Sequence, residues 1–171
     1  MKHLGFIDQL MDAGIASFKI EGRMKSEYYV ATVVNAYRRR IDDILAGRKS
    51  DLRRLRNELE SVSHRPYSTG FYFGELKHVG GDGGEYVQGC QYSADIVSIE
   101  NGRAEIILKN KFREGDVLEA VTPSGADISF AVANITDENG ESLPDAPVPT
   151  RTYFIDCPDG LSAGDILRKR L

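Results

Sequence analysis

The stretch "SFKIEGRMKSEYYVATVVNAYRRRID", which begins at Ser17, constrains the fold more than any other part of the sequence. It predicts a short buried strand over residues 17–21, ended by Gly22 and followed by a long amphipathic helix. A buried parallel strand cannot satisfy its own backbone or bury both of its faces, so it needs neighbouring strands. The sequence around it supplies none. We therefore expect this region to belong to a longer protein or to pair with another chain.

The remaining residues up to position 62 predict helices. Apolar residues at helical spacing run from Leu4 until Gly14 stops the helix, Ser26 caps the long helix, and Ser50 or Asp51 caps another. The long helix carries an apolar stripe that we expect to face the core, formed by Tyr29, Val30, Val33, Val34, Tyr37, Ile41 and Leu45. The order helix–strand–helix–helix is typical of the repeating unit of a TIM-like α/β barrel.

Short β-type runs separated by turns dominate the rest of the chain. Asn-Gly at 101–102 is a strong hairpin signal, and the segments "FREGDVLEA" and "LSAGDILRK" each place Gly-Asp in a turn before an apolar strand. We therefore predict an α+β fold. Its parts are a barrel segment over residues 1–62, an aromatic and glycine-rich linker over 63–80, and a small antiparallel β-barrel over 81–171.

The charge distribution also separates the two halves. Residues 1–78 hold 14 Lys and Arg against 10 Asp and Glu, whereas residues 79–171 hold 8 against 16. The acidic half is a poor candidate for gripping phosphate backbones by bulk charge, so a nucleic-acid contact would use the first half or a local patch. No apolar run approaches the roughly 20 residues that cross a bilayer, and the N-terminus lacks a signal-peptide pattern. We expect a cytoplasmic protein without a membrane partner.

No complete catalytic set of residues can be recognised in the sequence. Cys90 and Cys157 lie outside any metal-binding or redox spacing, so we expect reduced thiols and neither a metal nor another cofactor in this chain. Three histidines and these cysteines form no recognisable nucleophile–base set. The run "VGGDGGEYVQG" lacks the spacing of a phosphate loop and predicts a surface loop. The chain alone is not expected to be an active enzyme.

The first candidate site is "KIEGRMK", at the end of the predicted strand. Loops after the carboxyl ends of parallel strands carry ligands and catalysis in α/β folds, which makes Lys19, Glu21 and Arg23 candidates to line a site, with Lys25 close by. The alternative is structural: a Lys19–Glu21 ion pair, with Arg23 on the solvent side.

The second candidate is "SHRPYSTGFYFG". His64, Arg65, Tyr67 and Tyr72 combine aromatic surfaces with cationic or polar donors, a mixture that suits a base, an aromatic acid or a phosphate ligand. We take them as candidate substrate-binding residues. The alternative is a structured linker whose aromatic side chains fill a seam between domains.

The same stretches resemble the C-terminal part of peptidase family U32. "FKIEGRMK", "YYVATVVNAYR" and "RPYSTGFYFG" stand in the order and spacing of that family, and "KNKFREGDVLE" and "GDILRKRL" resemble its C-terminal β-domain. The resemblance covers essentially the whole chain. It implies an upstream TIM-like barrel as a partner within the same protein, and site-lining roles for Glu21 and Arg23.

The resemblance leaves several functions open. The family is labelled as collagenase-like protease, which implies that this chain is the C-terminal part of a protease with the β-barrel as an accessory substrate-binding module. Other members take part in hydroxylation of tRNA or ribosomal RNA, and some carry an iron–sulfur cluster on cysteines absent from this chain. A non-catalytic interaction domain is the third reading. Peptide or RNA would be the substrate, and the exposed helix over residues 26–45 would favour a homodimer.

Overall fold

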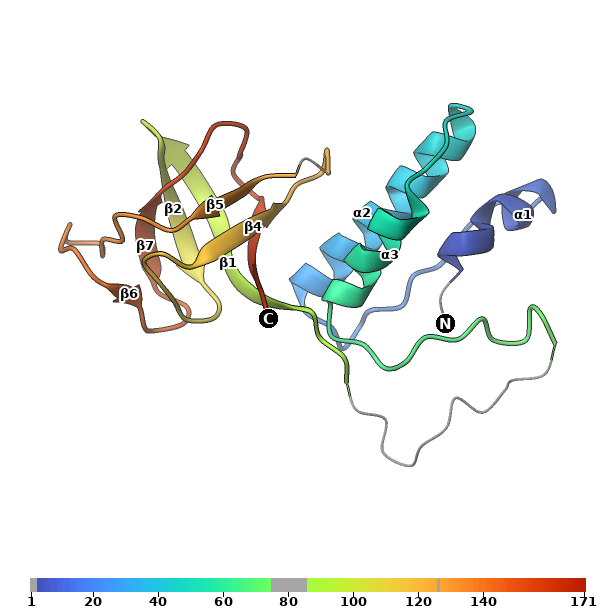
Figure 1. The fold of residues 1–171 in the computed structure, drawn as a ribbon, viewed down its shortest axis with the longest axis horizontal. Helices are drawn as coiled ribbons and strands as arrows, with labels where there is room; N and C mark the ends of the chain where they lie inside the picture. The colour runs from blue at the N-terminus through green and yellow to red at the C-terminus, as the bar shows by residue number, and fades with distance from the viewer. Residues whose placement is uncertain (1–2, 75–85, 126) are drawn as a thin grey trace. The chain divides into compact units, whose positions relative to one another are not determined.

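The structure is a computed structural model that describes residues 3–74, 86–125 and 127–171. The chain divides into two compact units, Met1–Gly89 and Cys90–Leu171, which we call the α unit and the β unit. Figure 1 shows helices in the first unit and curled strands in the second. The predicted α+β fold class is confirmed.

The described part of the α unit contains η1 (Leu4–Phe6), α1 (Ile7–Asp12), α2 (Glu27–Leu45) and α3 (Leu52–Ser61). Both longer helices begin at residues that the sequence marks as caps. The Ser26 hydroxyl accepts the backbone N–H of Tyr29 at 3.3 Å, and the Asp51 carboxylate accepts that of Arg54 at 3.0 Å. Each cap satisfies a donor that the first helical turn leaves unpaired. None of the described helices is both long and apolar enough to span a membrane.

The strand predicted over residues 17–21 does not form in the described part of the chain. Residues 15–22 connect α1 to α2 without regular secondary structure, and they pair with none of the described strands. This prediction is wrong because a strand is defined by hydrogen bonds to a neighbouring strand, and the described residues offer none here. Most of the predicted glycine-rich loop, residues 79–85, lies outside the described residues.

The face of α2 that packs within the α unit differs from the predicted apolar stripe. Tyr28, Thr32 and Ala36 are buried, and the Tyr28 hydroxyl lies 3.1 Å from Ser61 Oγ on α3. Of the seven stripe residues only Val33 is buried, because α3 covers the side of α2 that begins at Tyr28. The prediction of a core-facing stripe is therefore wrong for most of its members.

The β unit contains β1 (Cys90–Glu100), β2 (Arg103–Leu108), β3 (Phe112–Arg113), β4 (Val117–Val121), β5 (Ser129–Ala131), β6 (Asp145–Ala146), β7 (Thr152–Asp156) and β8 (Ile166–Arg170). Six strands form one sheet in the order β5-β4-β8-β1-β2-β7, and β3 pairs with β6; every pairing is antiparallel. Alternate residues of β2, β4 and β7 point into one apolar core, as Ala104, Ile106 and Leu108 do on β2.

Two local features shape this sheet. The predicted hairpin joins β1 to β2 through Asn101 and Gly102, whose φ angles of 52° and 76° are those of a type I′ turn. The chain after β5 then crosses to the opposite edge, where Thr136 and Phe154 exchange two backbone hydrogen bonds of 2.9 Å. That exchange links the chain after β5 to β7 and explains why the antiparallel sheet curls.

The two Gly-Asp segments adopt the same turn. Asp116 accepts the backbone N–H of Arg113 on its carboxylate at 3.0 Å, and Asp165 accepts that of Ser162 at 2.8 Å. The glycine before each aspartate has a φ between +80° and +90°, which side chains other than glycine rarely adopt. The strands that follow, β4 and β8, pair with one another, so the echo in the sequence is a structural repeat.

Candidate functional site

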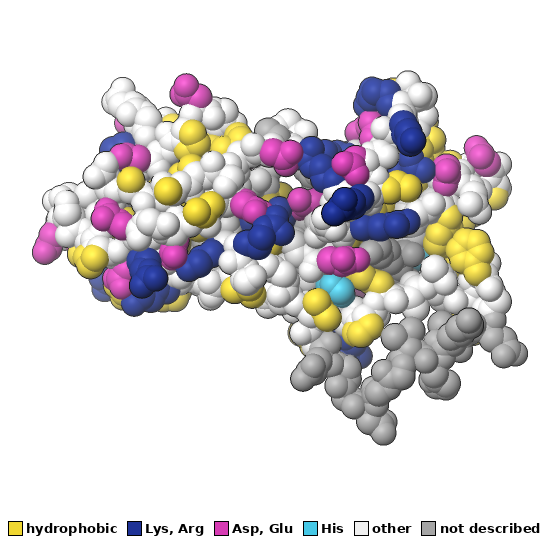
Figure 2. All heavy atoms as spheres, in the orientation of Figure 1, with side chains coloured by type: hydrophobic (Ala, Val, Ile, Leu, Met, Phe, Trp, Pro, Cys, Tyr) yellow, Lys and Arg dark blue, Asp and Glu magenta, His cyan; other side chains and the backbone are white. Residues whose placement is uncertain are grey.

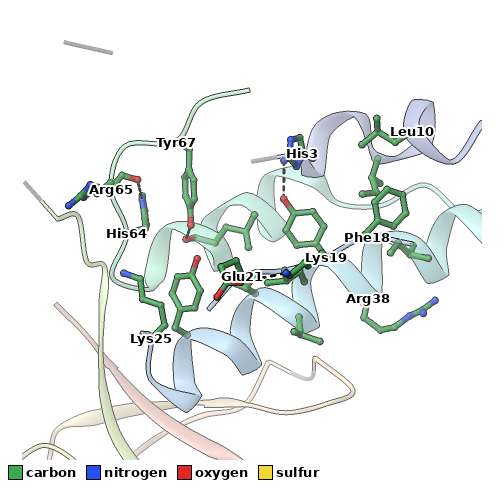
Figure 3. Close-up of a pocket in the computed structure, with 18 of the residues that line it drawn as sticks. His3, Leu10, Phe18, Lys19, Glu21, Lys25, Arg38, His64, Arg65 and Tyr67 are labelled. Carbon is green, nitrogen blue, oxygen red and sulfur yellow. Dashed lines mark hydrogen bonds and ion pairs between the residues drawn. The ribbon is translucent and has the colours of Figure 1, made fainter. Parts of the chain in front are cut away.

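The α unit holds a cavity of about 920 Å³. Its wall comes from η1 and α1, the segment 15–21, one face of α2, and residues that follow α3. Figure 3 shows His64, Arg65 and Lys25 grouped at one end of the cavity and Leu10, Phe18 and Arg38 at the other. The apolar stripe of α2 faces this hollow, since Tyr29, Val33, Val34, Tyr37 and Ile41 all line it.

Six of the seven site residues predicted from the sequence line this one cavity: Lys19, Glu21, His64, Arg65, Tyr67 and Tyr72. They come from two segments more than 40 residues apart. Arg23 is the exception: it does not line the cavity, and its backbone N–H donates to Glu21 Oε1 at 3.1 Å. The sequence missed Tyr29, Tyr37 and Tyr86 as lining residues because the first two were assigned to the core.

Lys19 and Glu21 form the ion pair that the structural alternative expects. Lys19 Nζ lies 4.0 Å from Glu21 Oε2, and the two side chains are 84% and 61% exposed. An exposed pair at that distance is screened by water and holds neither side chain firmly. These two residues thus present opposite charges at the rim of the cavity, with little net charge between them.

His64 is the most constrained polar residue of the cavity wall. It is 6% exposed, its ring stacks on Tyr67 with centroids 4.0 Å apart, and its Nδ1 lies 2.7 Å from the carbonyl oxygen of Arg65. A carbonyl can only accept, so Nδ1 carries the proton and Nε2 of the neutral ring is an acceptor. Nε2 is buried and has no hydrogen-bond partner in the described part of the chain. Buried polar atoms in folded proteins are nearly always paired, so this one requires an explanation.

Two cations lie beside His64. Lys25 Nζ donates to the carbonyl oxygen of Ser63 at 2.9 Å and lies 4.5 Å from the centroid of the Tyr86 ring. The guanidinium of Arg65 lies 5.7 Å from the same ring centroid. Among the described residues, neither cation has a carboxylate within ion-pair distance. This end of the cavity is therefore electropositive and suited to an anionic group.

Three phenols of the cavity, those of Tyr29, Tyr37 and Tyr67, remain neutral around neutral pH. Burial raises the pKa of Tyr67 and of Tyr29, and it also raises that of Tyr37 against the hydrogen bond from His3. The Tyr67 hydroxyl donates to the carbonyl oxygen of Leu59 at 2.8 Å, and the Tyr37 hydroxyl accepts the backbone N–H of His3 at 2.9 Å. These rings offer flat apolar surface with fixed polar tips, which suits a planar ligand.

The described residues do not assemble a protease-like nucleophile or a metal site. Ser17 lines the cavity without a hydrogen bond to either histidine of its wall, and that wall contains no cysteine. Within the described ranges, no group of three or more His, Cys, Asp or Glu side chains is arranged to hold a metal. Cys90 is buried and Cys157 half-buried, both in the β unit. These two thiols do not fit the ligand set of an iron–sulfur cluster.

The cations of the β unit are mostly neutralised by its own carboxylates. Seven of the eight, all except Arg151, lie within ion-pair distance of Asp or Glu: Arg103, Lys109, Lys111, Arg113, Arg168, Lys169 and Arg170. Figure 2 shows basic and acidic side chains next to one another over this unit. Bulk attraction of a polyanion to the β unit is therefore weak. Lys25 and Arg65 near Tyr86, which have no carboxylate partner within the described ranges, are the better candidates.

Comparisons with known proteins agree along the whole chain. A model described as "Peptidase family U32" matches residues 1–80, and one described as "Peptidase family U32 C-terminal domain" matches residues 88–168. The tRNA hydroxylation protein P of Escherichia coli is 33% identical over 99% of this chain and 38% of its own length. The chain thus spans less than two fifths of that relative.

Two further matches are shorter. A collagenase of Porphyromonas gingivalis is 35% identical over 44% of this chain and 21% of its own length. Among solved structures, the C-terminal domain of a protein assigned to the U32 peptidases of Geobacillus thermoleovorans matches 47% of this chain and 93% of that chain, with 23% identity and a TM-score of 0.45.

Proposed function

Because this chain belongs to peptidase family U32, we propose that it is the C-terminal part of a protein that takes part in tRNA hydroxylation. In this proposal the α unit contributes one wall of the substrate site, and the β unit is an accessory module. The upstream part of the same protein completes the site as a partner. A cytoplasmic location is part of the same proposal, because tRNA is the substrate that it names.

The extent of the sequence match is the observation that carries this proposal. The match to the tRNA hydroxylation protein covers 99% of the chain and so includes both units, whereas the match to the collagenase covers 44%. Because the tRNA hydroxylation protein matches the β unit as well as the α unit, the match supports a substrate that both units serve. A fold alone does not decide function, so the chemistry of the cavity has to agree.

The cavity agrees with an RNA ligand better than with a peptide undergoing hydrolysis. Lys25 and Arg65 lie near Tyr86 with no carboxylate partner among the described residues, a combination of cationic and stacking groups that suits a nucleotide. Peptide hydrolysis with a protein nucleophile needs a base beside that nucleophile, and hydrolysis with a metal needs a ligand set; the described cavity residues show neither arrangement. The cavity therefore supports recognition, with the reaction chemistry elsewhere in the protein.

Binding to unmodified tRNA tests the proposal. We expect the 171-residue chain to bind a tRNA transcript in fluorescence anisotropy, with an affinity that falls as salt rises. Lys25→Gln and Arg65→Gln should each weaken binding and lower the salt dependence. The exposed Arg23→Gln removes the same charge outside the cavity and serves as the control. Absence of salt-dependent tRNA binding would contradict the proposal.

A peptidase accessory role is the second candidate, because a collagenase matches the chain over 44% of its length. The same assay with denatured collagen peptides separates the two functions. Salt-insensitive binding of these peptides, without binding of tRNA, would favour this second candidate.

A further inference from the structure

We propose that His64, Lys25 and Arg65 form a ribonucleotide subsite that reads the 2′-hydroxyl of RNA. This inference rests on the proposed function, because it names how the same cavity recognises its RNA. The phosphate lies between Lys25 and Arg65, and the ribose 2′-hydroxyl donates its proton to His64 Nε2.

The unpaired acceptor on His64 identifies the kind of group that is missing. Nδ1 is used by the carbonyl oxygen of Arg65, so Nε2 is the acceptor of the ring in its neutral form. The ring is 6% exposed and is held by stacking on Tyr67, which fixes the direction of the lone pair. An acceptor that is buried without a partner is costly, and a ligand hydroxyl or N–H would satisfy it.

The two cations indicate that the ligand carries an anionic group next to the hydroxyl or N–H that pairs with His64. Lys25 Nζ is bound to the carbonyl oxygen of Ser63, the residue before His64, and the guanidinium belongs to the residue after it. Both cations lie within 6 Å of the Tyr86 ring centroid, so two like charges share this end of the cavity. Among the described residues no carboxylate offsets their repulsion, whereas a phosphate placed between them would.

A donor close to a phosphate distinguishes RNA from other nucleotide chemistry. In RNA the 2′-hydroxyl adjoins the 3′-phosphate of the same nucleotide, and DNA lacks that hydroxyl. The Tyr86 ring is 54% exposed and offers a surface on which a base can stack, and stacking tolerates any base. The subsite thus selects ribose over deoxyribose without selecting sequence.

The experiment compares three fluorescent probes of equal length: oligouridylate, its deoxy counterpart, and its 2′-O-methyl counterpart. The methyl ether keeps the oxygen but cannot donate. We expect the 171-residue chain to bind the ribose probe about fivefold more tightly than both others, the ratio expected for one net hydrogen bond. Equal affinities for ribose and 2′-O-methyl probes would overturn the subsite.

Two isosteric variants separate the acceptor from the fold. In His64→Asn the amide nitrogen replaces Nδ1 and keeps the bond to Arg65, but no acceptor remains at the Nε2 position. His64→Gln places its amide oxygen near Nε2 and loses the other bond. We expect His64→Asn to abolish the preference for ribose and His64→Gln to retain part of it. The reverse order would overturn the assignment of Nε2.

The salt dependence of RNA affinity tests the role of the two cations separately. Lys25→Gln combined with Arg65→Gln should reduce the slope of log affinity against log salt by about 0.7, the value for one phosphate contact on a single strand. An unchanged slope would overturn the phosphate position. If tRNA binds but neither the sugar preference nor the slope responds, the subsite fails and the proposed function stands. If no RNA binds, the proposed function fails as well.

Discussion

Arg168 places its guanidinium against the carboxylate of Glu119 at the centre of the β4–β8 pair, with both Nε and Nη2 3.0 Å from Oε2. The two residues are direct cross-strand partners. They also occupy equivalent positions in the two Gly-Asp segments, three residues after each aspartate. The two copies of the repeat thus contact each other through this pair. An acid in one copy and a base in the other make the pairing of β4 with β8 attractive, whereas two copies of either strand would oppose like charges.

Glu119→Gln should destabilise the β unit by about 2–4 kcal/mol, because it removes the carboxylate that both the buried Arg168 and Arg170 contact. Glu119→Gln combined with Arg168→Gln should recover part of that loss, since a buried charge is removed together with the carboxylate. Urea unfolding of both variants and of Arg168→Gln completes a double-mutant cycle. Additive losses would mean that the two side chains are not coupled.

The aspartates of the two equivalent turns should respond oppositely to removal of their charge. Burial acts to raise the pKa of Asp116, but the bond from Lys169 Nζ at 2.7 Å and the backbone N–H of Arg113 outweigh burial and lower it. Burial raises the pKa of Asp165, where Ala120 occupies the position equivalent to Lys169. We expect Asp116→Asn to lower the free energy of unfolding at neutral pH and Asp165→Asn to raise it or leave it unchanged.

The pH dependence of stability follows from the same two shifts. A carboxyl group with a lowered pKa stabilises the fold above its unfolded pKa, and that contribution is lost as pH falls below about 4. Asp116→Asn should therefore flatten the acid side of the stability profile. A raised pKa has the opposite sign, so the benefit of Asp165→Asn should grow as pH rises from about 4 to 7. Urea midpoints across this range test both, with the exposed Asp159→Asn as control.

The sequence predicts most of the β unit and less of the α unit, for a physical reason. Strict alternation and the Asn-Gly turn are local signals, and β1 and β2 form where those signals lie. Six candidate residues also line one cavity. They could be identified from the sequence because both of their segments are rich in polar and aromatic residues. The strand over 17–21 depends on distant partners that no local pattern supplies. His64 Nε2 becomes conspicuous only when burial and partners are known.

The clearest error of the sequence-based prediction concerns which face of α2 packs against α3, and this error can be tested directly. Tyr28 and Tyr29 are adjacent and chemically identical, but only the Tyr28 hydroxyl contacts α3. Ser61 Oγ donates to the carbonyl oxygen of Glu58 at 2.7 Å, so Tyr28 donates to Ser61. Tyr28→Phe should reduce the free energy of unfolding by about 1 kcal/mol. Tyr29→Phe, on the cavity side, should leave it unchanged in the same urea titration. Equal losses would mean that the helix packs through its apolar stripe after all.

The exposed part of that stripe predicts self-association of the 171-residue chain. Val30 and Val34 are 39% and 44% exposed and lie one turn apart on α2, where Val34 also lines the cavity. Burial of this apolar surface against a second copy is favourable at about 25 cal/mol per Å², so dimers should form as concentration rises. Light scattering should show a mass that grows with concentration, and Val30→Lys with Val34→Lys should return it to the monomer. Leu45→Lys, at the far end of the helix, is the matched control. A wild-type mass that stays monomeric at every concentration would remove the case for a homodimer through α2.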